Sequence, residues 1–276
     1  MDPYLYALIS TFVPEHFSVL TELAGGLLIK EIRNGNTYAN GVLHSFNDEP
    51  ATKCDDIQRW CKNGLSHRDN DLPAQIWTNG SQYWFKNGKL HRDNDLPAVV
   101  KIENGYQAWY QHNKLHRDND LPAIIEHNGY QAWYQHNKLH RDNDLPAVVS
   151  SSGTKEWFRN GKLHRDNDLP AKIHSYGTEE WYLSGMLHRD NDLPAVITFN
   201  GSREWCQHGK LHRNNDLPAV VRINGYREWW QNGKLHRDNG PAIIYSTGCQ
   251  YWYQNGELCN GTWIYDRGGQ SIISYH

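Results

Sequence analysis

Apolar and polar residues alternate along short segments of this chain, and turn-forming residues interrupt the alternation at regular intervals. The stretch from Pro97 to His116 shows the pattern: PAVVKI, then the turn ENG, then YQAWYQ, then HNKLH. A period of two places successive side chains on opposite faces of a β-strand. Asn-Gly between two such segments supplies the positive φ angles of a tight hairpin. The pattern therefore predicts a unit of two antiparallel strands, and the segments are too short for a crossover helix.

This unit recurs in tandem along most of the chain. The string HRDNDLPA, with two variants, begins at His67, His91, His116, His140, His164, His188, His212 and His236. A decayed copy, HSFNDEPA, begins at His44, and the nine histidines are spaced 23, 24, 25 and then five times 24 residues apart. A tryptophan keeps the same interval at Trp60, Trp84, Trp109, Trp133, Trp157, Trp181, Trp205, Trp229 and Trp252. We interpret residues 34–258 as nine tandem β-hairpin repeats whose histidines and tryptophans form a structural ladder.

The alternation also predicts which positions are buried. Two residues after the alanine of each copy stands an aliphatic residue, as at Val100 and Ile125, whereas the position next to the alanine admits Gln75 and Lys172. We expect the invariant aliphatic face to be buried and the other face to be only partly covered. The predicted fold is an all-β repeat protein, an elongated, twisted, single-layer antiparallel β-hairpin array stabilised by stacking between neighbouring units.

The two ends of the chain depart from the repeat. Residues 1–33 carry apolar residues at helical spacing and no repeat marker, so we predict a short helical N-terminal cap. Residues 259–276 contain Trp263, Ile264 and Ile272, and we predict a degenerate C-terminal capping unit there. Open sheet arrays need such protection at their edges.

Charge and cysteine content narrow the classes of partner. The net charge of −3 offers no basic field for nucleic acid or for an anionic membrane, so neither partner is expected. The five cysteines lack metal-type spacing, and Cys206 occupies a position that is aromatic in sister copies. We interpret it as a small apolar side chain in a reducing, intracellular compartment. The aromatic ladders could stack bases or sugars, but packing between neighbouring units is the favoured interpretation.

The repeated polar string invites two chemical interpretations. His-Arg-Asp begins the catalytic loop of protein kinases, but many copies occur here without a Gly-rich loop or Asp-Phe-Gly. Oxygen-rich turns such as Asp142, Asn143 and Asp144 could instead form a ladder of Ca²⁺ sites, although Arg141 inside the same copy would repel a cation. The favoured hypothesis needs no cofactor: Asp and Asn shape a turn through side-chain to backbone hydrogen bonds, and Arg pairs with an Asp of the neighbouring unit.

The segment NGYREWWQNGKLH resembles a MORN-type repeat, a β-hairpin with an aromatic-Glu-x-Trp strand and a Lys-x-His return strand. The matching residues are Tyr226, Glu228, Trp229, Asn232, Gly233, Lys234 and His236. His-Arg-Asp-Asn-Asp-Leu-Pro-Ala replaces the usual His-Gly-x-Gly, and this variant resembles MORN-like proteins multiplied in amoeba-infecting giant viruses. For a viral chain, the resemblance implies a place in the host cytoplasm or the virion.

We therefore expect a non-catalytic scaffold that binds a protein partner or assembles with itself into a homo-oligomer, such as a viral structural or virus-factory component. Two alternatives stay open. Residues around Pro14 and Glu15 resemble part of an F-box, which implies a ubiquitin-ligase adaptor with the array as its target-binding module. The MORN family has also been proposed to associate with phosphoinositide membranes.

Overall fold

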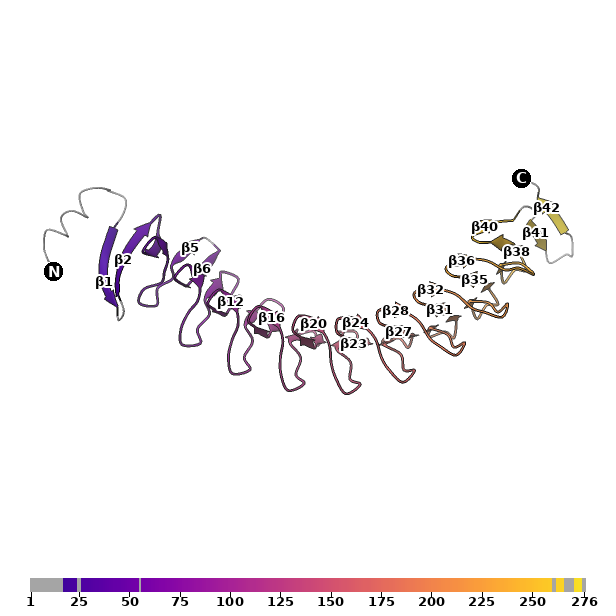
Figure 1. The fold of residues 1–276 in the computed structure, drawn as a ribbon, viewed down its shortest axis with the longest axis horizontal. Coiled ribbons are helices and arrows are strands. Elements are labelled where there is room, and N and C mark those ends of the chain that lie inside the picture. Colours follow the sequence, from indigo (N-terminus) through magenta and orange to yellow (C-terminus); the bar gives the residue numbers. More distant parts are fainter. Residues whose placement is uncertain (1–16, 24–25, 55, 260–261, 266–270, 275–276) are drawn as a thin grey trace. The chain divides into compact units, whose positions relative to one another are not determined.

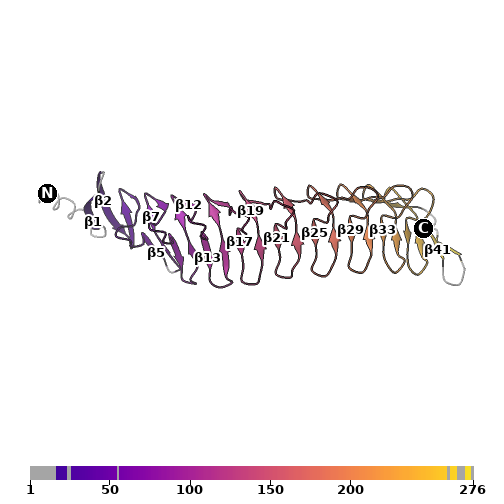
Figure 2. The ribbon, with the colours of Figure 1, turned by 90° about the horizontal axis from the view of Figure 1, so that it is seen from below.

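The computed structural model describes residues 17–23, 26–54, 56–259, 262–265 and 271–274, with side-chain surroundings from residue 30 to residue 259 apart from Asp55. Every regular element among these residues is a β-strand (Figures 1 and 2). This confirms the prediction of an all-β hairpin array. The chain divides into two units, Met1–Lys138 and Leu139–His276, and each is described by itself.

The first unit contains a small sheet and a row of repeats. The small sheet has the order β1-β2-β3-β4, with β1 Phe17–Leu23, β2 Gly26–Arg33, β3 Asn36–Ala39 and β4 Val42–Leu43. Successive antiparallel pairings then build the main sheet of this unit. Its strands are β5 Thr52–Cys54, β6 Ile57–Arg59, β9 Gln75–Trp77, β10 Gln82–Tyr83, β13 Val99–Lys101, β14 Tyr106–Ala108, β17 Ile124–Ile125 and β18 Gln131–Ala132.

The main sheet of the second unit continues the same design. Its strands also pair in antiparallel order along the chain. They are β21 Val148–Val149, β22 Lys155–Glu156, β25 Lys172–Ile173, β26 Glu179–Glu180, β29 Val196–Ile197, β30 Arg203–Glu204, β33 Val220–Val221, β34 Arg227–Glu228, β37 Ile243–Ile244 and β38 Gln250–Tyr251.

Each repeat also carries a separate two-stranded hairpin beside the sheet. The hairpin strands are β7 Cys61–Lys62 and β8 Leu65–Ser66, β11 Phe85–Lys86 and β12 Lys89–Leu90, β15 Tyr110–Gln111 and β16 Lys114–Leu115, β19 Tyr134–Gln135 and β20 Lys138–Leu139, β23 Phe158–Arg159 and β24 Lys162–Leu163, β27 Tyr182–Leu183 and β28 Met186–Leu187, β31 Cys206–Gln207 and β32 Lys210–Leu211, β35 Trp230–Gln231 and β36 Lys234–Leu235, and β39 Tyr253–Gln254 and β40 Glu257–Leu258. The prediction of two strands per repeat is therefore incomplete.

The tryptophan is the residue at which a strand changes its partner. The Trp109 amide donates to the Ala123 carbonyl of the next repeat at 2.9 Å, and the Trp109 carbonyl accepts from the His116 amide of its own hairpin at 3.2 Å. One backbone group thus bonds to the sheet and the other to the hairpin. The long strand predicted around Trp is divided at this point for that reason.

The repeat alanine and the residue after it form the core. The repeat alanines have no exposed surface, and Val99, Ile124 and Val220 are buried, whereas the aliphatic residues two positions after the alanine are only half-buried. The predicted assignment of faces is therefore wrong. The prediction treated the position next to the alanine as exposed because polar residues occur there. Their polar groups have partners in the structure, since Gln75 donates to the Ser66 hydroxyl and Lys172 pairs with Glu156.

The predicted helical cap over residues 1–33 is not observed. Residues 1–16 lie outside the described residues, while β1 and β2 pair antiparallel from Phe17↔Ile32 to Leu23↔Gly26. A physical reason lies in the sequence, because Gly25 and Gly26 fall inside the predicted helical segment and glycine weakens a helix.

The C-terminal segment predicted as a degenerate unit contains one further strand pair. β41 Thr262–Tyr265 pairs antiparallel with β42 Ser271–Ser274, and β41 lies against β38. Residues 260–261, 266–270 and 275–276 of that predicted unit lie outside the described residues.

The space around the glycine of a sheet turn differs between repeats. Gly105 has φ +62°, and a Cβ there would meet the His127 Cβ at 2.7 Å, whereas Gly129, with φ +90°, has nothing within 4 Å. Both positions disfavour any other residue because of their positive φ, but only Gly105 also lacks space.

We predict that Gly105→Ala lowers the free energy of unfolding more than Gly129→Ala. The left-handed conformation costs each variant about 1–2 kcal/mol, and overpacking against His127 adds about 1–3 kcal/mol at Gly105. Urea unfolding followed by tryptophan fluorescence measures the difference. Equal losses in the two variants would contradict the close contact between turns.

Candidate interaction surface

The loop His-Arg-Asp-Asn-Asp follows each hairpin and returns the chain to the sheet. In the loop from His67 to Asp71, Asn70 has φ +61° and Asp71 has φ +54°, and the Leu72 amide closes the turn onto the Asp69 carbonyl at 3.3 Å. Asn and Asp tolerate this left-handed region better than most residues. The predicted side-chain to backbone bonds of Asp and Asn are not made in this loop, because the two Asp carboxylates bind other side chains instead.

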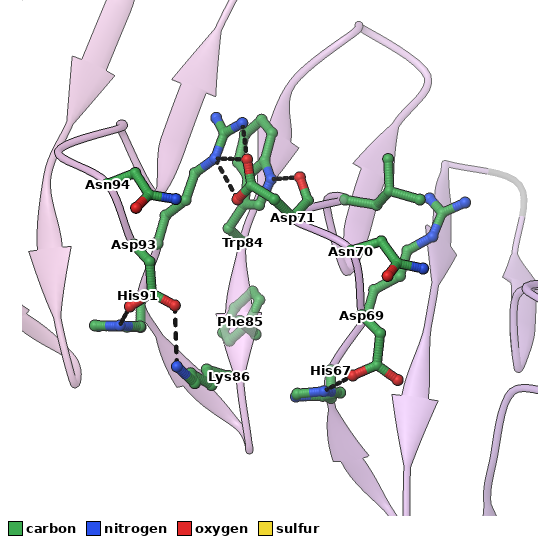
Figure 3. A pocket seen from close by; sticks show the side chains of 13 residues that line it. His67, Asp69, Asn70, Asp71, Trp84, Phe85, Lys86, His91, Asp93 and Asn94 are labelled. Atoms are coloured by element: carbon green, nitrogen blue, oxygen red, sulfur yellow. Dashed lines mark hydrogen bonds and ion pairs between the residues drawn. The ribbon is translucent and has the colours of Figure 1, made fainter.

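An arginine joins each loop to the loop before it (Figure 3). Arg92 donates through Nε and Nη2 to the Asp71 carboxylate at 2.9 and 2.8 Å, and its guanidinium lies 3.9 Å from the ring centroid of Trp84. The Trp84 Nε1 donates to the backbone carbonyl of Asp71 at 3.0 Å. One aspartate is thus held through its carboxylate and its carbonyl by two side chains of the following repeat.

The same arrangement recurs within both units, and the predicted pairing of Arg with an Asp of the neighbouring repeat is confirmed. The pairs are Arg68–Asp48, Arg92–Asp71, Arg117–Asp95, Arg165–Asp144, Arg189–Asp168, Arg213–Asp192 and Arg237–Asp216. The arginine hydrogen bonds hold the pKa of the carboxyls below their ordinary value at Asp48, Asp95, Asp144, Asp168, Asp192 and Asp216. A stacked arginine that also binds bidentately is fixed in orientation.

The repeat histidine bridges its own loop and the next hairpin. Nδ1 of His67 accepts from the Asn87 amide at 3.1 Å, so the neutral ring carries its proton on Nε2 and donates to Asp69 at 2.8 Å. His140, His164, His188, His212 and His236 bond the next hairpin in the same way. At His91 and His116 the Nδ1 atoms have no hydrogen-bond partner. His112 and His136 stack on these two rings at 4.5 Å, and His208 stacks on His188 at 4.7 Å.

The predicted tryptophans form the inner wall of this surface. The eight from Trp60 to Trp229 are buried, while Trp252 is half-buried. Sequence reasoning singled out the tryptophans and histidines but missed the arginine that stacks on each ring. Its constant offset of eight residues from the tryptophan, as in Trp60 and Arg68, was a signal available in the sequence.

Shallow hollows open between successive loops. One of about 190 Å³ lies between the loops that begin at His67 and His91 (Figure 3), and the next, of about 230 Å³, lies between the loops of His91 and His116. A smaller hollow of about 80 Å³ borders Leu193 and Trp205 in the second unit. Each is lined by loop side chains and by the buried tryptophan. A leucine at the rim of each loop is 37–39 % exposed, at Leu72, Leu96, Leu121, Leu145, Leu169, Leu193 and Leu217.

The charged side chains at this surface bind one another. Burial raises the pKa of the Cys206 thiol to about 12, which leaves almost no thiolate for nucleophilic attack. In the described part of the chain, no group of three or more His, Cys, Asp and Glu side chains is arranged to hold a metal ion. Among the same residues, no helix is long and apolar enough to cross a membrane.

Comparison with family models and with curated proteins found no match to this chain.

We predict that the stacked arginine contributes far more to stability than an exposed one. Arg117→Ala removes the stack on Trp109, at 3.8 Å, and the pair with Asp95, and should lower the free energy of unfolding by about 1–3 kcal/mol. Arg159→Ala is the matched control, because Arg159 also pairs with an aspartate, Asp166, but both side chains are about half exposed. The free energy of unfolding of Arg159→Ala should fall by less than about 0.5 kcal/mol. Equal losses in urea unfolding would refute the proposed importance of the stack.

We also predict that the array loses stability in acid. Because the folded pKa of Asp95 and its counterparts is lowered, the arginine pairs stabilise the fold above the unfolded pKa of about 3.9. That stability disappears as the pH falls through the lower folded pKa. Urea midpoints should therefore be level near neutral pH and fall below about pH 4. Asp95→Asn should show a smaller acid-induced fall than the wild type, and an identical fall in both would contradict this cause.

Proposed function

We propose that this chain is a non-catalytic scaffold whose loop surface binds a protein partner, a second copy of itself, or both. The observation that carries the proposal is the regular recurrence of one composite feature, a hollow bordered by a half-exposed leucine and by charged loop side chains. The arginine stacks hold that feature in one geometry from repeat to repeat. A rigid surface loses little conformational entropy when a partner binds.

The periodicity indicates the kind of partner that fits. Two sheet strands per repeat place equivalent hollows roughly 9.6 Å apart, since neighbouring strands are spaced by about 4.8 Å. A partner that is itself repetitive can engage several hollows at once, and each further contact then forms at high effective concentration. A filament, a capsid layer or a second array has this property.

The resemblance to MORN-type repeats and to their variants in giant viruses supports a structural role in an infected cell or a virion. The adaptor alternative receives less support, because residues 17–23 and 26–33 are strands and the F-box resemblance rested on a helical leader. We therefore propose the scaffold role alone.

We predict that replacing the rim leucines weakens association while leaving the array folded. The variant carries Leu169→Ser, Leu193→Ser and Leu217→Ser, at positions 37–38 % exposed. The control carries Phe199→Ser and Ile223→Ser, which remove exposed apolar side chains from the sheet turns of the same unit, 69 % and 68 % exposed. Thermal melting checks that both variants fold.

The measurement combines light scattering over a concentration series, with and without Ca²⁺, with cross-linking of the full chain in extract from its source cells. Rim variants that lose self-association or cross-linked partners, beside a control that keeps them, would support the proposal. A wild type that stays monomeric and cross-links the same proteins as the rim variant would contradict it. An increase in particle mass that requires Ca²⁺ would favour the ladder of Ca²⁺ sites instead.

A further inference from the structure

Four glutamates form a strip on one face of the second unit's sheet. Glu156, Glu180, Glu204 and Glu228 each precede the tryptophan of successive repeats, and we call them the Glu strip. The strand register places Glu180 opposite Val196, which lies opposite Glu204, and the alternation continues through Val220 to Glu228. All four side chains are half-buried. A carboxylate in such a place needs compensating partners.

Three members of the strip have a basic partner within the unit. Lys172 Nζ lies 2.8 Å from Glu156, His174 Nε2 lies 2.7 Å from Glu180, and Arg222 Nη2 lies 2.6 Å from Glu204. Each partner comes from the sheet strands or turns beside the glutamate.

Glu228 is the exception. Its two carboxylate oxygens accept hydrogen bonds from the Tyr226 hydroxyl and from the Trp230 Nε1, the latter at 2.7 Å. Among residues 30–54 and 56–259, whose side chains are described, no basic group pairs with it. Both of its hydrogen-bond donors are uncharged, and no ion pair neutralises its charge among these residues. Arg222, which pairs with Glu204, also acts electrostatically on Tyr226.

A substitution in the repeat explains the difference. Arg222 and Tyr245 occupy equivalent turn positions, since each donates its amide to the carbonyl four residues later, that of Tyr226 at 2.9 Å and that of Cys249 at 2.8 Å. Glu204 pairs with Arg222 from the following sheet turn. At the equivalent position of the turn that follows Glu228 stands Tyr245.

The tyrosine belongs to a row of rings that begins at Tyr226, a donor to this carboxylate. Tyr245 meets Tyr226 edge-on at 5.1 Å between ring centroids and meets Tyr251 at 5.7 Å. Tyr251 stands opposite Ile243, which stands opposite Glu228. Tyr245 is 41 % exposed, so the row is open to solvent. Burial and the neighbouring Glu228 raise the pKa of Tyr226, which keeps its hydroxyl protonated as a donor.

We propose that Glu228, together with Tyr226, Trp230, Tyr245 and Tyr251, binds a trimethylammonium group. Aromatic faces attract cations that carry diffuse charge, and the unpaired carboxylate supplies the opposite charge. Each carboxylate oxygen already accepts one hydrogen bond, which suits a cation without N–H donors better than a primary amine. A metal ion would need several oxygen ligands, and the described residues supply one carboxylate. The site does not depend on the scaffold function proposed above.

The test is a titration of the full-length chain with tetramethylammonium chloride and with choline chloride, against sodium chloride at equal ionic strength. The signals are the indole N–H resonances in NMR spectra, with that of Trp230 assigned through Trp230→Phe. The site predicts a saturable shift of the Trp230 resonance with both ammonium salts and weaker binding of butylammonium. A shift that does not saturate, or that sodium reproduces, would overturn the proposal.

Three variants separate the site from general effects. Glu228→Gln keeps an acceptor oxygen for the Trp230 indole, offers its amide N–H to the Tyr226 hydroxyl, and removes the charge. It should weaken tetramethylammonium binding by roughly tenfold or more, the equivalent of about 1.4 kcal/mol. Tyr245→Arg copies the preceding repeat and supplies an internal counterion, so it should abolish binding while the array stays folded. Glu180→Gln, at a paired glutamate two repeats earlier, should leave the affinity within about twofold.

Unchanged affinity in both Glu228→Gln and Tyr245→Arg would refute the site. If the site binds tetramethylammonium, vesicles of phosphatidylcholine and of phosphatidylglycerol distinguish a lipid headgroup from a free ammonium compound as its ligand. Flotation of the wild type, but not of Tyr245→Arg, with phosphatidylcholine alone assigns the site to a lipid headgroup. Binding of choline without flotation assigns it to a free ammonium compound.

Discussion

The architecture of each unit depends on the arginine that stands between a tryptophan ring and an aspartate of the preceding repeat. Arg117 stacks on Trp109 and forms a bidentate pair with Asp95, while the Trp109 indole donates to the Asp95 carbonyl at 3.0 Å. Its third contact, from Nη1 to the Pro122 carbonyl, fixes the exit of its own loop. A single side chain thereby sets the distance between two loops and the direction in which the chain returns to the sheet. The aspartate is too exposed for the ion pair alone to supply much energy, so the stack and the shared geometry carry the contribution.

Because this contact joins nearest neighbours, the stability of each unit is a sum of repeat and interface terms. The residues that make the interface recur most regularly: tryptophan and the buried alanine in all nine copies, and arginine and the second aspartate in eight. The alanine has no exposed surface, and its backbone bonds both to the adjacent sheet strand and to the tryptophan of the preceding repeat, as Ala123 does. A larger side chain there would push adjacent strands apart. Positions outside this interface are free to vary, and variation is concentrated at the sheet turns and in the residue before the tryptophan.

The sequence alone was sufficient for the hairpin array and for the pairing between Arg and the neighbouring Asp, because these follow from periodicity and turn chemistry. It was insufficient where tertiary contacts override a local pattern. Lys172 beside the alanine suggested an exposed face, yet Glu156 neutralises it on the more buried one. The apolar leader suggested a helix, yet β1 pairs with β2 through seven register positions. The hollows between loops have no signature in the sequence, since they arise from the spacing of two copies and not from the residues of one.

An array built from copies of one interface has few places in which to encode specificity, and this constrains where its function can be located. The loop surface is nearly invariant, so it suits partners that repeat with the same period. A discriminating site must instead come from residues that the interface leaves free, and the Glu strip is such a set. Lys172, His174 and Arg222 come from different positions and satisfy three glutamates, which shows that no single geometry is imposed there. The exchange of Arg222 for Tyr245 one repeat later changes a neutralised carboxylate into one beside a row of aromatic rings, without altering the backbone hydrogen bond of the turn. A repeat protein can therefore acquire a local binding site through one substitution at a tolerant position while every inter-repeat contact is retained.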